Sequence, residues 1–171
     1  MSDELLLLPI TIRLATPDDA ATIAGHRSGM FLDLGRFDAE RAAAMADDLI
    51  PIFQRMVSSG EYVGWLAVAE DGTVAAGAGV QLRTLLPRPE TAVTREALVV
   101  NVYVQPEYRR NGLARRLMVA ILDWLREQGI ERVALHASIM GRPLYESLGF
   151  TATNEMALYL RCGPLPLSPS P

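Results

Sequence analysis

The fold of this 171-residue chain is decided by the stretch from Val102 to Met118, which reads VYVQPEYRRNGLARRLM. An apolar, β-branched run ends at a proline, and a turn containing Gly112 then leads directly into an amphipathic helix. Such a turn directs several backbone N–H groups at one spot, where the helix dipole adds positive potential. Glycine also lets a ligand approach the backbone closely. Four arginines lie within eight residues and suit phosphate oxygens: Arg109, Arg110, Arg115 and Arg116.

Two interpretations of this turn remain open from the residues alone. One is a phosphate site, and the other is an ordinary turn followed by a solvated helix face. The turn is not the dinucleotide motif, because Gly-x-Gly-x-x-Gly is missing, and it is not a Walker loop, because Gly-Lys-Ser/Thr is missing.

The elements around the turn predict a mixed sheet with helices on both faces. Upstream, the apolar pattern predicts strands at Ile10–Leu14, Tyr62–Glu70, Thr73–Leu86 and Ala97–Val104, with a hairpin turn at Asp71-Gly72. Helices are expected from Thr16 to about Gly35 and from Asp38 to about Val57, where Pro51 kinks or divides the second. Downstream, we expect a helix from Leu113 to Gly129, a strand at Arg132–Ala137, a short helix at Pro143–Leu148 and a strand at Met156–Leu160.

Composition limits the classes of protein to which the chain can belong. Half of the residues are hydrophobic and 21% are charged, which excludes a wholly disordered chain. The length suits one core. A net charge of −4 argues against a dedicated nucleic-acid binder. The single cysteine cannot form an internal disulfide, and no apolar run approaches the ~20 residues of a membrane span, so a cytoplasmic protein without a membrane anchor is expected.

Two motifs carry a family resemblance. The pattern Arg109-x-x-Gly112-x-Ala114 resembles the acyl-CoA motif of the GNAT superfamily of N-acetyltransferases. Further along, Leu144-Tyr-Glu-Ser-Leu-Gly-Phe150 resembles the C-terminal motif of that superfamily. The resemblance covers about residues 10–161. It implies an α/β fold with a mostly antiparallel sheet of about six to seven strands, which splays into a V between its two central strands. We expect one domain at 1–162 and a proline-rich, disordered tail at 163–171.

The resemblance implies acetyl-CoA as the cosubstrate. The turn amides would hold the pyrophosphate, and the strand ending at Val104 would bond the pantetheine arm. A bulge in that strand would splay it from the strand at 132–137, and an N–H near Val102 would polarise the thioester carbonyl. Many members carry Asn and Ala where this chain has Ser138 and Gly141. The cofactor-binding residues implied are Val102, Tyr103, Val104, Arg109, Arg110, Asn111, Gly112, Leu113, Ala114, Arg115 and Ser138.

Two residues are candidates for catalysis. Tyr145 matches the tyrosine of the family motif that donates a proton to the leaving thiolate, and its alternative role is packing. The central strand offers no carboxylate, and Glu96 at its start lies far from the motif. We therefore expect a water relay positioned by Asn101 to deprotonate the amine, with a buried amide bonded to the backbone as the alternative.

The acceptor side is expected around the first helix. The pattern Arg27-x-x-Met30-Phe31-x-Asp33-x-Gly35, together with Asn101-Val-Tyr-Val104, resembles a bacterial subgroup of the superfamily and names no acceptor. Asp33 either binds an amine cation or is solvated. His26 is a possible base, whereas His136 is expected to be a structural residue within a strand. No metal site is predicted.

These observations favour an N-acetyltransferase in which a small-molecule or peptide amine attacks acetyl-CoA directly in a ternary complex. Cys162 lies outside both motifs, which argues against an acyl-cysteine intermediate. The missing carboxylate motivates an alternative, a non-catalytic module that binds or senses acyl-CoA. A nucleic-acid contact through the arginine cluster is a third hypothesis, which the acidic net charge weakens. A homodimer is compatible with the family.

Overall fold

A computed structural model describes residues 9–36, 38–87, 94–158 and 160 of the chain. The chain divides into two compact units, Met1–His136 and Ala137–Pro171, and each is described by itself. The expected tail at 163–171 lies outside the described residues.

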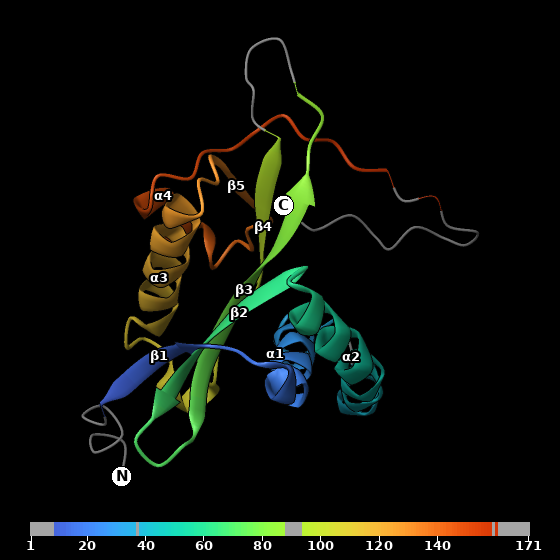
Figure 1. Cartoon of the computed structure of the whole chain (residues 1–171). Helices are drawn as coiled ribbons and strands as arrows, with labels where there is room; N and C mark the ends of the chain where they lie inside the picture. Colours follow the sequence, from blue (N-terminus) through green and yellow to red (C-terminus); the bar gives the residue numbers. More distant parts are fainter. Residues whose placement is uncertain (1–8, 37, 88–93, 159, 161–171) are drawn as a thin grey trace. The chain divides into compact units, whose positions relative to one another are not determined.

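The first unit contains one five-stranded sheet with the strand order β1-β2-β3-β4-β5 (Figure 1). The strands are β1 (Ile10–Leu14), β2 (Tyr62–Ala69), β3 (Val74–Thr84), β4 (Arg95–Val104) and β5 (Arg132–Leu135). Neighbours pair antiparallel except β4 and β5, which are parallel. The mixed, mostly antiparallel sheet is therefore confirmed, with fewer strands among the described residues than the six to seven expected.

Two helices cover one face of this sheet. Helix α1 (Ala20–Asp33) follows a 3-10 turn at Pro17–Asp19, and α2 (Ala39–Ser59) begins where the Asp38 side chain accepts the Arg41 N–H at 2.8 Å. We expected Pro51 to kink or divide the second helix, and α2 continues through Pro51 as one element, so Pro51 does not divide it. Leu49, Ile50, Met56 and Val57 pack against the buried cluster under α2 and hold the helix together on both sides of the proline.

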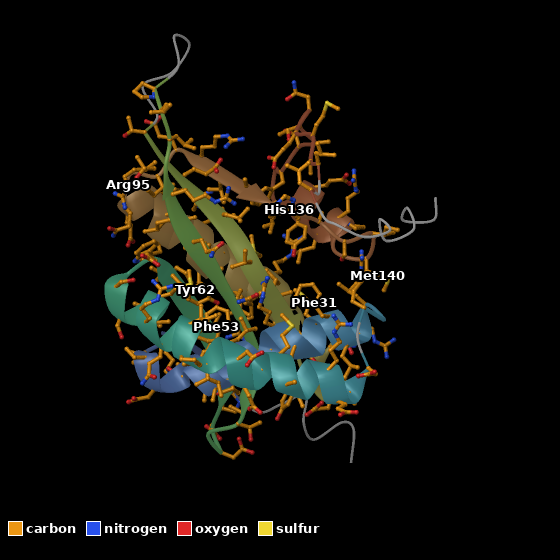
Figure 2. All side chains as sticks on the ribbon, turned by 90° about the vertical axis from the view of Figure 1, so that its right-hand side faces the viewer. Phe31, Phe53, Tyr62, Arg95, His136 and Met140 are labelled. Atoms are coloured by element: carbon orange, nitrogen blue, oxygen red, sulfur yellow. The ribbon has the colours of Figure 1, made fainter. Side chains whose placement is uncertain are left out.

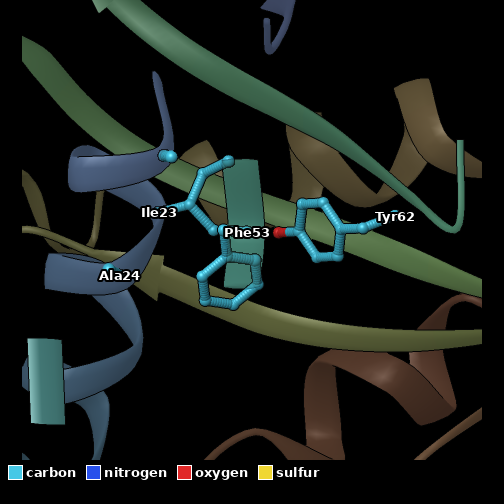
Figure 3. Close-up of a cluster of buried hydrophobic side chains, with 5 residues drawn as sticks. Ile23, Ala24, Phe53 and Tyr62 are labelled. Carbon is cyan, nitrogen blue, oxygen red and sulfur yellow. The ribbon is translucent and has the colours of Figure 1, made fainter. Parts of the chain in front are cut away.

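The core lies on both faces of the sheet. On the α1–α2 side, Ile23, Ala24, Phe53 and Tyr62 form a buried cluster with Ala20 (Figure 3). Figure 2 shows Phe53 and Tyr62 among the side chains of that layer. Helix α3 (Leu113–Glu127) covers the other face and buries the predicted apolar stripe of Leu113, Leu117, Met118, Ile121 and Leu125. This packing fixes the start of α3 relative to the end of β4.

The second unit contains α4 (Arg142–Ser147), which confirms the predicted short helix. The predicted strand at Met156–Leu160 is wrong for the described residues, which form no strand there. Met156 and Leu158 are 95% and 81% exposed. Their alternation with polar residues suits a strand, but a strand also needs a hydrogen-bonded neighbour, and none pairs with this segment in the described part of the unit. No helix in the described ranges is both long and apolar enough to cross a membrane.

Candidate functional site

Strand β4 contains a β-bulge. Its register with β3 shifts from Gly79↔Val100 to Gly77↔Tyr103, so that two residues of β4 lie opposite one residue of β3. The first residue in the bulge, Asn101, has a φ of +58°. Asparagine tolerates this left-handed conformation better than most residues, at a cost of about 1–2 kcal/mol. The expected bulge is present, and it turns the backbone of the strand just before Val102.

The pairing of β4 with β5 ends just before the bulge. Their parallel pairing runs from Glu96↔Arg132 to Val99↔Leu135 and then stops. In the described residues, the β4 edge from Val100 to Val104 has no strand partner on the β5 side. The end of this pairing agrees with the splaying of the two central strands that the sequence predicted. An unpaired strand edge offers N–H and C=O groups in a row to an extended ligand.

The turn between β4 and α3 has the backbone geometry of an anion site. Arg110 has a φ of +65° and Gly112 a φ of +73°. Left-handed residues in such a turn direct successive N–H groups to the same side, as in anion-binding nests. Gly112 is the N-cap of α3 and supplies no side-chain cap, so the first amides of the helix remain available to a ligand. A Cβ at Gly112 would meet no heavy atom within 4 Å, which leaves room for a phosphate.

The exposed side chain of Arg109 contacts three other residues of the chain. Its Nε donates to the carbonyl oxygen of Val104 at 3.0 Å, and its Nη2 pairs with the carboxylate of Asp33. The guanidinium also lies over the Tyr103 ring at 5.7 Å. The sequence left two interpretations of Asp33, a ligand for an amine cation or a solvated acid. In the structure its carboxylate instead pairs with Arg109, an arginine of the motif.

The remaining motif residues divide into exposed and buried positions. Arg110, Asn111 and Arg115 are exposed, whereas the side chain of Leu113, the first residue of α3, is buried. Leu113 can therefore contribute only its backbone to a ligand in the turn.

Asn101 is 4% exposed and has two side-chain partners. Its Oδ1 accepts a hydrogen bond from Nη1 of Arg27 at 2.7 Å, and its Nδ2 donates to the hydroxyl of Tyr62 at 3.5 Å. Burial raises the pKa of Tyr62 to about 12, so this hydroxyl stays neutral at pH 7. The two partners described for this buried amide are thus side chains, whereas the alternative considered from the sequence was a bond to the backbone.

His26 lies close to the end of β4. Its ring is 5.3 Å from that of Tyr103, it is 4% exposed, and burial lowers its pKa to about 4. It is therefore neutral at pH 7, and its Nε2 has no hydrogen-bond partner within the described structure. The expectation of a structural role for His136 within a strand is wrong, because β5 ends at Leu135 and His136 is exposed.

Glu96 is the one carboxylate of β4, and it is buried between two arginines. It pairs with Arg83 of β3 at 3.8 Å and with Arg132 of β5, its register partners on either side. Five residues of strand separate it from Asn101, a span of roughly 16 Å. Glu96 therefore ties three strands together and lies far from the bulge, as expected.

In the second unit, Tyr145 lies on α4. Its ring packs edge-on against Phe150 with centroids 6.0 Å apart, and burial raises the pKa of its phenol, which is therefore protonated at pH 7. Ser138 Oγ accepts the Gly141 N–H at 3.1 Å. A Cβ at Gly141 would come within 3.0 Å of the Tyr145 ring, so an alanine there would require the ring to shift.

Sequence reasoning missed the importance of Arg27 and Tyr62. The sequence shows Arg27 only as part of a pattern around the first helix and Tyr62 only as the first residue of a strand. A signal did exist, because an asparagine inside an apolar strand needs partners for its amide. In the described part of the chain, no group of three or more His, Cys, Asp or Glu side chains is arranged to hold a metal ion.

Comparisons with known proteins agree with this geometry. The model of the acetyltransferase (GNAT) family matches residues 31–150. An aminoglycoside N(6')-acetyltransferase type 1 from Stenotrophomonas maltophilia is 30% identical over 163 residues, which cover 94% of this chain and 95% of that protein. The alanine N-acetyltransferase of ribosomal protein bS18 from Escherichia coli is 38% identical over 61 residues, 34% of this chain and 41% of that protein.

Solved structures show the same fold. The chain is similar to a GCN5-related N-acetyltransferase from Ralstonia eutropha, with a TM-score of 0.80 and 31% identity over 89% of this chain and 99% of that one. A predicted acetyltransferase from Clostridium acetobutylicum, solved with acetyl-CoA, has a TM-score of 0.79 at 24% identity, covering 88% of this chain and 96% of the other.

Proposed function

The chain belongs to the GNAT family of acetyltransferases, and on that premise we propose that it acetylates a small-molecule amine directly from acetyl-CoA, with both substrates bound together. Transfer of an acetyl group to an amine is the activity of the family and of its named relatives. The observation that best supports the proposal is the bulged, unpaired edge of β4 leading into the turn at Gly112. This arrangement offers one surface for an extended arm and another for phosphates.

We propose that acetyl-CoA binds by its pyrophosphate to the turn and by its pantetheine arm to β4. The turn contribution is mostly backbone, because the side chain of Arg109 is held by Asp33 and Val104. Along β4, the N–H near Val102 is the proposed partner of the thioester carbonyl. The proposed contacts are those at Val102, Tyr103, Val104, Arg109, Arg110, Asn111, Gly112, Leu113, Ala114 and Arg115. Ser138 is a further candidate, since its hydroxyl proton remains available beyond the bond from Gly141.

We propose Tyr145 as the group that donates a proton to the departing thiolate, which its raised pKa supports. For the amine, we propose a water relay at Asn101. Its amide keeps one acceptor lone pair and one N–H beyond the bonds to Arg27 and Tyr62, enough to hold a water. His26 is a weaker candidate, because burial lowers its pKa to about 4.

Aminoglycosides are the first acceptors to test. The relative named for that activity matches nearly the whole chain, including the segment that holds α1 and α2, whereas the alanine N-acetyltransferase matches about a third. A net charge of −4 also attracts a cationic acceptor to the protein through long-range electrostatics.

The wider setting of the protein is also proposed. We place the enzyme in the cytoplasm, where acetyl-CoA is made. Residues 1–162 are proposed to form one acyltransferase domain, because the family match at 31–150 includes parts of both compact units. A homodimer is proposed as well, and light scattering on the purified full-length chain tests it.

A screen of amines that follows release of free CoA tests the proposed function. We expect turnover with at least one aminoglycoside and none with alanine-initiated peptides, and each reaction needs a control without acceptor to subtract hydrolysis. Cys162→Ala should leave the rate unchanged, because the amine attacks the thioester directly. Tight acetyl-CoA binding without turnover across the panel would instead identify a non-catalytic binding module.

A further inference from the structure

Arg27 reaches from the acceptor-side helix α1 to the bulge of β4. Its Nη1 donates to Asn101 Oδ1 at 2.7 Å, across 74 residues of sequence, and its guanidinium lies over the Phe31 ring at 5.2 Å. Within the described residues it forms no salt bridge, although it is half-buried. Withdrawing an arginine from water without a carboxylate partner costs free energy, so another contact has to offset that cost.

The contact with Asn101 acts on a residue whose backbone needs support. At a φ of +58°, Asn101 is in a conformation that an ordinary residue leaves readily for the extended form of a strand. Arg27 holds the oxygen end of its amide, and Tyr62 holds the nitrogen end. Because both ends are held and the side chain is buried, the amide cannot swing out to let the backbone relax. The charged donor makes the bond to Arg27 the stronger of the two.

We propose that Arg27 is a positioning residue that locks the β4 bulge through Asn101 and so fixes the direction of the backbone groups of Val102. This inference rests on the proposed binding of acetyl-CoA along β4. Arg27 need not touch either substrate for this role. The same hydrogen bond connects α1, the helix expected on the acceptor side, to β4, the strand proposed for the cosubstrate.

The role makes a specific demand on the residue at position 101. Glycine adopts a left-handed conformation without help from a side chain. If Arg27 acts only by holding Asn101, a glycine there should make Arg27 dispensable. If Arg27 instead acts on a substrate or supports the packing of α1, its loss should lower acetyl-CoA affinity by the same factor in the parent chain and in Asn101→Gly.

The experiment therefore combines Arg27→Met, Asn101→Gly and the double variant in the full-length chain. Acetyl-CoA and CoA are the probes, titrated by calorimetry, and a crystal structure of Arg27→Met reports the φ of Asn101. We expect Arg27→Met to weaken acetyl-CoA binding about tenfold, since a relaxed bulge forfeits the alignment of the strand edge. The double variant should bind within about twofold of Asn101→Gly, and Arg27→Lys, which keeps a charged donor, should recover part of the loss.

Arg55→Met is the matched control, because Arg55 is an exposed helical arginine on α2 that pairs with Glu61 at 3.3 Å, away from the bulge. It should leave both affinities unchanged. The lock is overturned if Asn101 keeps its left-handed φ in Arg27→Met, or if Arg27→Met costs the same affinity in the Asn101→Gly background. If the bulge relaxes in Arg27→Met while acetyl-CoA affinity stays constant, the positioning role of Arg27 on Asn101 is supported. That result would instead overturn the proposed binding of acetyl-CoA along β4.

Discussion

The guanidinium of Arg109 joins the carboxylate of Asp33, at the end of α1, to the carbonyl oxygen of Val104, at the end of β4. Both charged side chains are about 40% exposed, so the ion pair itself contributes at most ~1 kcal/mol. Its effect is geometric, because it fixes the first residue of the turn against two elements. With this side chain engaged, the proposed recognition of phosphate in the turn would rest mainly on the backbone amides around Gly112.

Substitution of Gly112 tests recognition by the backbone. Gly112→Ala adds a methyl group where nothing lies within 4 Å, but the φ of +73° becomes costly by about 1–2 kcal/mol. We expect acetyl-CoA binding to weaken by roughly tenfold as the turn relaxes or the methyl meets the phosphates, as measured by calorimetry. The matched control is Gly72→Ala in the β2–β3 hairpin, which has a φ of +86° and equally open surroundings. It should lower the melting temperature by a similar amount and leave acetyl-CoA affinity intact.

Local features of the site could be predicted from the sequence, whereas its long-range contacts could not. The turn at Gly112 follows from neighbouring residues, since a glycine N-cap and an apolar stripe are adjacent in the chain. The bond between Arg27 and Asn101 joins positions 74 residues apart, and no local pattern encodes which residues meet across a sheet and a helix. The wrong strand at Met156–Leu160 has the same cause, because alternation describes one strand while pairing needs a second.

Tyr145→Phe tests the proposed proton donor. The variant keeps the ring that packs against Phe150 and loses only the hydroxyl, so folding should be unaffected. We expect kcat to fall by about 10²-fold with the acceptor found in the amine screen, while the Kd of acetyl-CoA changes less than twofold. An unchanged kcat would assign Tyr145 to packing alone.

His26 predicts a loss of stability in mild acid. Burial lowers its pKa to about 4 in the folded state, against an ordinary value of about 6.5, so the unfolded chain binds the proton first as the pH falls. The stabilisation is complete above about pH 6.5 and declines as the pH falls toward 4, and the difference between the two pKa values corresponds to about 3 kcal/mol. Urea unfolding at several pH values should show this decline, and His26→Asn should remove it. His136→Asn, at the exposed histidine, should leave the slope unchanged. The same slope in His26→Asn as in the parent chain would mean that His26 titrates normally.

Two glycines of the first unit should respond in opposite ways to the same added methyl group. A Cβ at Gly79 of β3 would lie 2.2 Å from both the hydroxyl oxygen and Cζ of Tyr62, whose ring is buried against Phe53 and cannot move aside freely. We expect Gly79→Ala to destabilise the protein by about 3 kcal/mol, because the overpacked core must shift. Gly25 is exposed within α1, and a Cβ there meets nothing within 4 Å, so Gly25→Ala should stabilise the helix by about 0.5–1 kcal/mol. Thermal unfolding should therefore move in opposite directions for the two variants. A Gly79→Ala protein with the parent melting temperature would show that the Tyr62 ring does not pack on β3 as described, and the contact of its hydroxyl with Asn101 would then lose its support as well.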